Sequence, residues 1–402
     1  MAIVKDIKII LDSEYSGMNS GWPTRYIGLI SELYKHNKLV IYAPGDTSML
    51  KVLYPRSTVY GSYATETSIP SGRRNNRFIH LLKDILIPSR YNVRDYPIYC
   101  PELYRIIKQD KRNYDASIYF GRYAYIFYGE GDLSNIQVCD FCDSRYRELH
   151  NRLKKSKSLN DKLKIIYDII YVTRIKIRYI PSKLIIIAIT DKDCEYISMA
   201  LKNNKVIAIP NGIEYIRIDQ NEEYYKIKYN SPYVTFIGTL NYEPNEQSIL
   251  YILNDIWPKL ADRYPNLIFR IIGRSPSDKI KQTVRSIDRV ELIGPVDNVY
   301  SYSIMSKIFL APIFSGAGMK NKFLESFNSG TPIITTPEGV IGIEFIPKKH
   351  GNVGSSTNEL IEAAISLLEC SYSDYKNYVV ECRSLAKKYS WDKVGDQLNG
   401  LI

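Results

Sequence analysis

The feature of this sequence that most constrains its fold is a repeated alternation of short apolar runs with segments of helical period. Each run is rich in Ile, Val and Leu and is too short to form a helix of its own. Strands that are apolar on both faces are typical of a parallel sheet covered by helices on each side. The first series of predicted strands comprises residues 7–12, 38–44, 116–121, 136–141, 184–190 and 206–210.

The alternation pauses at residues 211–232, a polar stretch with turn residues that we interpret as a linker, and then resumes. Residues 245–265 have apolar positions at spacings of three and four, which predicts a helix. A chain of 402 residues is too long for one ordinary core, so we expect two doubly wound α/β domains. The second series of predicted strands comprises residues 233–238, 267–273, 290–294, 308–313 and 332–336.

The chain is basic, with a formal net charge of +11. This favours an anionic partner, such as a nucleotide, a lipid phosphate, a membrane surface or a nucleic acid, without choosing among them. Two basic stretches, residues 62–113 and 145–164, are either solvated faces or surfaces that attract an anionic acceptor or a membrane. No apolar run reaches the roughly 18 residues of a membrane-spanning helix. Because the first residues also lack a signal-peptide pattern, we expect an intracellular protein.

Cys139 and Cys142 form the sequence Cys-x-x-Cys inside a strand-like run. No second pair stands at a spacing that would complete a zinc site. Buried free thiols are therefore favoured over zinc or redox chemistry, and we predict no metal-binding residues.

The stretch SGAGMKNKFLESFNSGTP, residues 315–332, combines flexible backbone, two cations and a lone carboxylate. A predicted strand leads into Gly316 and Gly318, and a helix is expected to begin one or two residues later. Glycines let a ligand approach the backbone closely, and the first helical turn presents unpaired N–H groups that bind phosphate. Lys320 and Lys322 would oppose the helix dipole in this position unless an anion docks there.

Lys322 and Glu325 are three residues apart and therefore share one face of the predicted helix. In a ligand role, Lys322 binds a phosphate and Glu325 accepts the hydroxyls of a ribose. For Lys322 the alternative is an ordinary ion pair within the helix, which adds little to stability. For Glu325 the alternative is a carboxylate on the protein surface. We favour the ligand role because ligands of doubly wound sheets bind beyond the carboxyl ends of the strands, and three strands here end in glycine or small residues.

Several segments together resemble the family 4 glycosyltransferases of the GT-B fold, and among them the exopolysaccharide and glycan sugar transferases. The resemblance is specific from about Tyr233 onward, and it rests on FIGTLNYEPN, IIGRSPS, ELIGPV, APIFSGAGMKNKFLESFNSGTPIITTPEGVIGIE and YSWDKV. It implies two Rossmann-like domains facing a central cleft. Residues 1–212 would form the acceptor domain and residues 213–385 the donor domain, with a final helix, residues 386–402, packed back on the first.

The resemblance also implies an activity, namely retaining transfer of a sugar from a nucleotide diphosphate sugar to a glycan, lipid-linked or other hydroxyl acceptor. No metal or other cofactor is obligatory in such transfer. The expected location is the cytoplasm, with contact at the inner membrane face left open.

The resemblance assigns the donor-binding positions residue by residue. It implies that Glu325 meets the nucleotide ribose. The backbone amides of Gly238 and Thr239 would approach the phosphates or the transferred sugar, and Gly294 and Val296 would border the base. The remaining donor-binding positions are Gly316, Gly318, Met319 and Lys320.

The sequence departs from the family pattern at two places. The family often carries two glutamates, and the first of them falls on Ala317, so contact with the sugar is expected from the amides that follow. The family's arginine and lysine after the first strand of this domain are also missing, because Thr239 and Asn245 stand there. We expect Lys322 and Arg274 to neutralise the diphosphate instead, although a loop arginine on the surface is the alternative for Arg274.

Two residues are singled out in the first domain. By resemblance, Gly21 lies in a loop near the donor phosphates, and a helix with Pro23 in its first turn is expected to follow it. The alternative is a plain strand-to-helix turn. Asp143 resembles an acidic position near the acceptor, with a catalytic contact, whereas helix capping together with Ser144 is the alternative. We assign no general base, because in front-side transfer the departing phosphate can take the acceptor's proton.

Other functions have weaker support in the sequence. Asp191-Lys192-Asp193 could hold a metal with a nucleotide, but its place at a helix start favours capping. The phosphate-binding lysine motif and the Gly-x-Gly-x-x-Gly fingerprint are absent, which argues against kinases and dehydrogenases. A nucleotide-sugar epimerase of the same architecture stays open, as does a basic nucleic-acid-binding or DNA-modifying protein, although no zinc or RNA-binding motif supports the latter.

Overall fold

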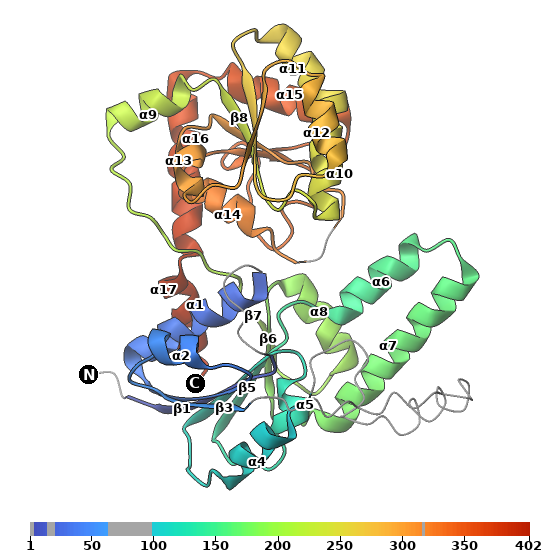
Figure 1. The fold of residues 1–402 in the computed structure, drawn as a ribbon, viewed down its shortest axis with the longest axis vertical. Helices are drawn as coiled ribbons and strands as arrows, with labels where there is room; N and C mark the ends of the chain where they lie inside the picture. Colours follow the sequence, from blue (N-terminus) through green and yellow to red (C-terminus); the bar gives the residue numbers. More distant parts are fainter. Residues whose placement is uncertain (1–3, 14–20, 63–98, 316–317) are drawn as a thin grey trace. The chain divides into compact units, whose positions relative to one another are not determined.

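The computed structural model describes residues 4–13, 21–62, 99–315 and 318–402. The chain forms two compact units (Figure 1). Unit 1 comprises Met1–Pro210 and Val394–Ile402, and unit 2 comprises Asn211–Lys393. Within the described residues, no helix is long and apolar enough to cross a membrane.

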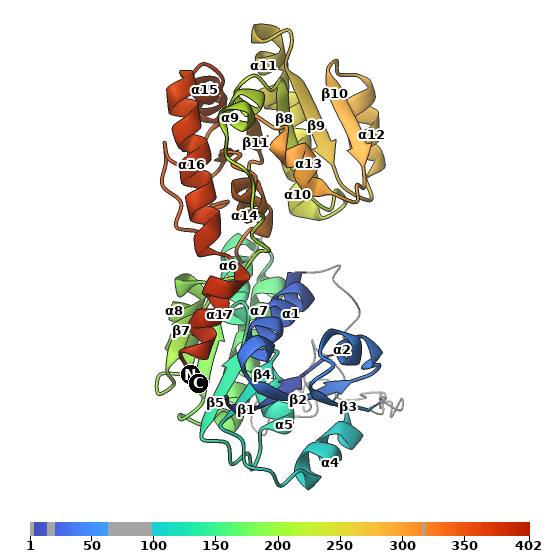
Figure 2. The same ribbon diagram turned by 90° about the vertical axis from the view of Figure 1, so that its left-hand side faces the viewer.

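Unit 1 is built on a seven-stranded sheet in which every paired neighbour is parallel, in the order β3-β2-β1-β4-β5-β6-β7. In β1, one of its inner strands, the side chains of Ile7, Ile9 and Ile10 are fully buried, because helices cover both faces (Figure 2). This is why its strands read as continuous apolar runs. The strands are β1 (Asp6–Leu11), β2 (Lys38–Pro44), β3 (Thr58–Ser62), β4 (Ala116–Phe120), β5 (Ile136–Asp140), β6 (Ile185–Ala188) and β7 (Val206–Ala208).

Three helices of unit 1 begin at a side-chain cap. The hydroxyls of Ser144, Ser158 and Thr190 each accept a hydrogen bond from a backbone N–H in the first turn of the helix that follows. The helices are α1 (Gly21–His36), α2 (Ser48–Leu53), α4 (Pro101–Gln109), α5 (Ala124–Tyr128), α6 (Arg145–Lys155), α7 (Leu159–Tyr179) and α8 (Asp191–Ala200), with most of α17 (Trp391–Asn399).

Unit 2 repeats the plan with a six-stranded parallel sheet in the order β10-β9-β8-β11-β12-β13. The expected α/β class, with two Rossmann-like units, is therefore confirmed. The strands are β8 (Tyr233–Ile237), β9 (Ile268–Ile272), β10 (Val290–Gly294), β11 (Ile308–Leu310), β12 (Ile333–Thr335) and β13 (Gly351–Val353). The helices are α9 (Glu222–Tyr229), α10 (Glu243–Tyr251), α11 (Trp257–Arg263), α12 (Asp278–Arg285), α13 (Val299–Ile304), α14 (Asn321–Asn328), α15 (Thr357–Leu368) and α16 (Tyr372–Lys388).

Three local details differ from what the sequence led us to expect. Residues 211–232 are not a bare linker, because they contain α9, whose Tyr224, Tyr225 and Lys228 are buried in unit 2. The strands β3 and β13 were not predicted. The helix expected over residues 245–265 is interrupted by a π-helical turn, Ile252–Ile256, just before Pro258, which lacks an N–H group for the regular ladder.

Candidate functional site

The carboxyl ends of β8, β9 and β10 meet through three glycines. The N–H of Gly238 donates to the carbonyl of Ile272 at 3.0 Å, and the N–H of Gly273 donates to the carbonyl of Gly294 at 2.9 Å. Gly273 has φ +151°, and a Cβ there would lie 1.7 Å from the carbonyl oxygen of Gly238. Only glycine fits this contact, so the sequence brings the three loops to one edge of the sheet, as predicted.

Gly294, one of these three glycines, and Gly318, which precedes α14, both leave open space beside the backbone. Gly294 has φ +81° and Gly318 has φ +75°, and a Cβ added to either would meet no atom within 4 Å. A position that requires glycine for its conformation and has room beside it suits close approach of a ligand. Donor binding by Gly238, Gly294 and Gly318 stays a prediction.

The helix α14 begins one residue later than the latest start that we expected. Lys320 is its N-cap residue, with extended backbone and no capping hydrogen bond from its side chain. The side chain turns back instead, and its Nζ donates to the carbonyl of Gly318 at 2.9 Å. The first-turn N–H groups therefore lack a side-chain cap, which leaves them for another acceptor. Met319, just before the cap, is buried.

Lys322 lies half-buried in the first turn of α14 and reaches another part of unit 2. Its Nζ donates to Oδ1 of Asn245 at 2.6 Å and lies 4.6 Å from the ring centroid of Phe236. Burial lowers the pKa of Lys322 to about 7; the charge of Lys320 lowers it further and that of Glu325 raises it. An anion beside this ammonium would restore its ordinary pKa.

Asn245 lies in α10 and connects Lys322 to the loop after β8. Its Nδ2 donates to the carbonyl of Thr239 at 2.9 Å, while its Oδ1 accepts from Lys322. The sequence indicated only that Asn245 stands where the similar family carries a cation. In the structure, the ammonium of Lys322 lies next to the Asn245 side chain.

Glu325 lies half-buried one turn after Lys322, yet the two residues, both in the described part of the chain, form no ion pair. The intrahelical ion pair considered above is therefore wrong. Burial raises the pKa of Glu325 to about 7, and the charge of Lys322 lowers it in part. Among the described residues, no group donates a hydrogen bond to this carboxylate. It keeps its capacity to accept hydroxyl donors.

The remaining positions predicted in unit 2 lie in the same loops. Arg274 is exposed after β9, and its carbonyl accepts from the N–H of Leu240 at 3.0 Å. Val296 is half-buried after β10. Gly316 and Ala317 lie outside the described residues. Ligand contacts of Arg274, Thr239 and Val296 stay predictions.

In unit 1, α1 begins at Gly21 and Pro23 lies in its first turn, as expected. Asp143 follows β5, and its Oδ1 accepts from Nη2 of Arg122 at 3.0 Å. Ser144, not Asp143, caps α6. Asp143 therefore has a cationic partner and half-exposed oxygens, while a catalytic role for it and a phosphate role for Gly21 stay predictions.

Thr190 caps α8, so the Asp-x-Asp triplet stands at a helix start. Asp193 is buried, and its carboxylate accepts hydrogen bonds from the Thr190 hydroxyl at 2.5 Å and from Arg147 at 3.4 Å. These contacts give Asp193 a packing role. Among the described residues, no group of His, Cys, Asp and Glu could hold a metal ion. The six cysteines are all free thiols.

Asp12, directly after β1, is a residue that the sequence reasoning missed. Its carboxyl group is buried at the carboxyl end of the sheet, burial raises its pKa to about 7, and its Oδ2 has no hydrogen-bond partner among the described residues. Gly121 leaves room for it, because a Cβ there would lie 1.9 Å from the carboxyl group. The sequence signal that could have identified Asp12 is an aspartate directly after an apolar strand.

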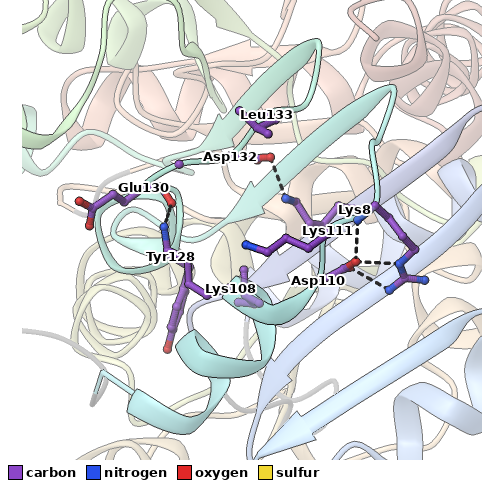
Figure 3. Close-up of a pocket in the computed structure, with 11 residues that line it drawn as sticks. Lys8, Lys108, Asp110, Lys111, Tyr128, Glu130, Asp132 and Leu133 are labelled. Carbon is purple, nitrogen blue, oxygen red and sulfur yellow. Dashed lines mark hydrogen bonds and ion pairs between the residues drawn. The ribbon is translucent and has the colours of Figure 1, made fainter.

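A separate pocket of about 130 Å³ lies in unit 1, at the amino ends of the strands (Figure 3). Its charged groups largely pair with one another. Lys8 contacts Asp132 at 2.7 Å, Arg112 contacts Asp110 at 2.8 Å, and Lys108 donates to the carbonyl of Glu130. Ligands of such sheets bind at the opposite ends of the strands. We do not assign the function to this pocket.

Comparison with known proteins gives three findings. Residues 231–370 match the family model described as glycosyl transferases group 1. Phosphatidyl-myo-inositol mannosyltransferase of Mycobacterium tuberculosis is 22% identical over 212 residues, which cover 50% of this chain and 54% of that protein. The chain thus spans about half the length of the curated relatives it matches.

Solved structures match over nearly the whole chain. HepE of Anabaena, in complex with UDP, has a TM-score of 0.64 at 13% identity and covers 99% of both chains. A glycosyltransferase of Rickettsia africae has a TM-score of 0.64 at 12% identity, covering 100% of this chain and 98% of its own. At such identities the likeness concerns the fold.

Proposed function

We propose that this chain is a GT-B glycosyltransferase that transfers a sugar from a nucleotide diphosphate sugar to a hydroxyl acceptor. This proposal agrees with the family resemblance found in the sequence. The subgroup of exopolysaccharide and glycan transferases stays a prediction. We name no donor sugar, although HepE of Anabaena was solved with UDP-glucose.

The observation that carries the proposal is the set of groups at one edge of the unit 2 sheet. Lys322 offers an ammonium whose lowered pKa an anion would restore, and Glu325 offers a carboxylate with unused accepting capacity. Gly318 provides an open stretch of backbone before an uncapped helix start. A pyrophosphate requires cations and amides, and a ribose requires an acceptor for its hydroxyls. In this proposal Arg274 adds a second charge at the diphosphate.

For the reaction, we propose retention of configuration at the anomeric carbon, with the departing phosphate taking the acceptor's proton. Lys322 and Arg274 then stabilise the charge that develops on the leaving group. Gly21 would lie near the phosphates, and Asp143 would contact the acceptor, a glycan or a lipid-linked glycan. No metal is obligatory. We place the protein in the cytoplasm, in peripheral contact with the inner membrane face.

Binding of UDP-glucose and of other nucleotide diphosphate sugars to the full chain tests the donor site. A ligand at about a hundred times its dissociation constant stabilises the folded state by about 2.7 kcal/mol, which a thermal-shift assay detects. Lys322→Gln and Glu325→Gln should each abolish most of the shift. The matched controls are Lys279→Gln and Glu362→Gln, which change exposed residues of α12 and α15 in the same unit. Equal shifts in all four variants would contradict the proposal.

Product analysis separates the open alternatives. Transfer with retention gives a glycoside that has the anomeric configuration of the donor, which NMR detects. The transfer activity should persist when a chelator is present. An epimerase would change the donor sugar without any acceptor. A nucleic-acid-binding protein would bind oligonucleotides with a steep salt dependence and show no saturable binding of sugar nucleotides.

A further inference from the structure

The helices α6 and α7 form a hairpin that extends away from the sheet of unit 1 (Figure 1). One face of α7 packs on the core of the unit, where Ile165, Val172 and Ile175 are almost fully buried. The opposite face would carry polar residues alone if it met only water. A stripe of apolar residues runs along it instead.

Four large apolar residues follow one another along the outer face of α7. They are spaced by four, three and four residues, so on a helix of 3.6 residues per turn they lie within about 60° of one another. This apolar stripe consists of Leu159, Leu163, Ile166 and Ile170, with exposed fractions of 72%, 58%, 41% and 40%. A single exposed leucine needs no explanation, but a continuous stripe opposite a buried face indicates a second contact surface.

The stripe is surrounded by positive charge at the tip of the hairpin. Between residues 152 and 164 the chain carries six exposed cations and a single anion, Asp161. Within the described residues, Lys154, Lys155, Lys157 and Lys162 form no ion pair. About half of the net charge of +11 is thus concentrated on thirteen residues. The six cations are Arg152, Lys154, Lys155, Lys157, Lys162 and Lys164.

We infer that this hairpin docks on an anionic lipid surface, with the apolar stripe inserted among the lipids and the lysines at the headgroups. An apolar face with flanking lysines and arginines is the pattern of helices that lie in a membrane interface. A second copy of the chain is a poorer occupant, because two such tips would bring like charges together. The inference deepens the peripheral membrane contact proposed above and names the surface that makes it.

Co-sedimentation of the full chain with vesicles tests the inference. One set of vesicles is phosphatidylcholine alone, and in the other about a third of the lipid is phosphatidylglycerol. We expect binding to the anionic vesicles only, weakening as salt is raised. The stripe variant Leu163→Ser/Ile166→Ser should weaken binding on the order of a hundredfold. Its control, Val52→Ser/Leu133→Ser, changes residues of unit 1 that are 73% and 82% exposed and should bind normally.

A charge variant tests the second half of the inference. Each lysine near an anionic surface strengthens binding roughly fivefold, so replacing Lys154, Lys155 and Lys157 by Gln should weaken it on the order of a hundredfold. The control replaces three exposed lysines elsewhere in unit 1 by Gln. These are Lys192, Lys202 and Lys205.

Several outcomes would overturn the inference. One is equal binding to both vesicle types. A second is a dimer, seen by light scattering, that the stripe variant dissociates while vesicle binding is absent. A third is a fall in melting temperature of the stripe variant but not of its control, which would mean that the stripe packs within the protein.

The donor assay distinguishes this inference from the proposed function. If the hairpin variants lose vesicle binding and keep the thermal shift with UDP-glucose, both stand. If vesicle binding fails while the shift persists, only the docking inference falls. Vesicle binding without any binding of nucleotide sugars would support the docking inference and contradict the proposed transferase function.

Discussion

Lys322 and Asn245 are 77 residues apart in the chain, and the ammonium of the first donates to the amide oxygen of the second at 2.6 Å. The same amide donates to the carbonyl of Thr239, so one asparagine links the first turn of α14 to the loop after β8. A long lysine side chain loses conformational freedom when it binds an anion. The hydrogen bond to Asn245 holds it in one position beforehand.

Replacing Asn245 by Ala should therefore weaken donor binding. A hydrogen bond to a charged group contributes about 1.5–3 kcal/mol, so we expect the affinity for the nucleotide diphosphate sugar that gives the thermal shift to fall about tenfold or more. Calorimetry measures this, with Asn254→Ala, an exposed asparagine of the adjoining π-helical turn, as the control. An unchanged affinity in a folded Asn245→Ala variant would show that Lys322 needs no such support.

Donor affinity should depend on pH through Lys322 and Glu325 in opposite directions. A bound pyrophosphate favours the ammonium, so the contribution of Lys322 is full below about pH 7 and declines as the pH rises above it. Ribose hydroxyls favour the carboxylate, so the contribution of Glu325 is full above about pH 7 and declines below it. The affinity should therefore peak near neutrality.

Two variants separate these contributions. Lys322→Gln should lose the decline on the alkaline side, and Glu325→Gln should lose the decline on the acid side, each with lower affinity at the peak. UDP-glucose titrations across the pH range measure both profiles. A profile that both variants share with the unmodified chain would exclude these residues from the donor site.

Much of the fold was predictable because the strands that cross the middle of each sheet are buried on both faces. Ile9 and Phe236, for example, are fully buried and stand in runs that no helix period explains. The strands β3 and β13 were not predicted, because Tyr60 and Asn352 belong to short segments of mixed polarity at the edges of the sheets. Such segments form strands because they pair with a neighbouring strand, and their own sequence does not indicate this.

The polar parts of the structure were less predictable, since they depend on contacts between distant segments. Residues 211–232 looked like a linker because they are polar and carry turn residues. Lys228 is nevertheless buried, with its Nζ donating to the carbonyls of Ile304 and Ser306 at 3.1 Å and to the Thr331 hydroxyl at 2.8 Å. Periodicity reveals the glycine-ended strands, but not that Lys322 would meet Asn245.

A buried ion pair in unit 1 gives a stability prediction. Oδ2 of Asp140 accepts from Nε of Arg25 at 2.7 Å, and both side chains are almost completely buried. Asp140→Ala removes the carboxylate partner of a buried guanidinium and should cost about 3–5 kcal/mol of unfolding free energy. Chemical denaturation measures the loss. The double variant Arg25→Met/Asp140→Leu should recover most of it, because no charge then remains buried; a double variant as unstable as the single one would contradict this account.

The last prediction concerns Lys176, a fully buried lysine of α7. Its Nζ has no hydrogen-bond partner among the described residues and lies 4.2 Å from the ring centroid of Phe141 and 4.8 Å from that of Tyr146. Burial holds the pKa of Lys176 well below its ordinary value of 10.5. Because Met fills similar space without an amine, Lys176→Met should stabilise unit 1 by about 2 kcal/mol at neutral pH.

The pH dependence of this gain identifies its cause. The unfolded chain binds a proton at Lys176 up to about pH 10.5, whereas the folded chain releases it at a lower pH. Between the two pKa values the unfolded state holds more protons, so the stability of the unmodified chain rises with pH. The advantage of Lys176→Met should therefore be larger at neutral pH and shrink as the pH approaches 10.5. The exposed Lys164→Met is the control and should show neither effect. A loss of stability in Lys176→Met would mean that the ammonium is charged and held by the two rings.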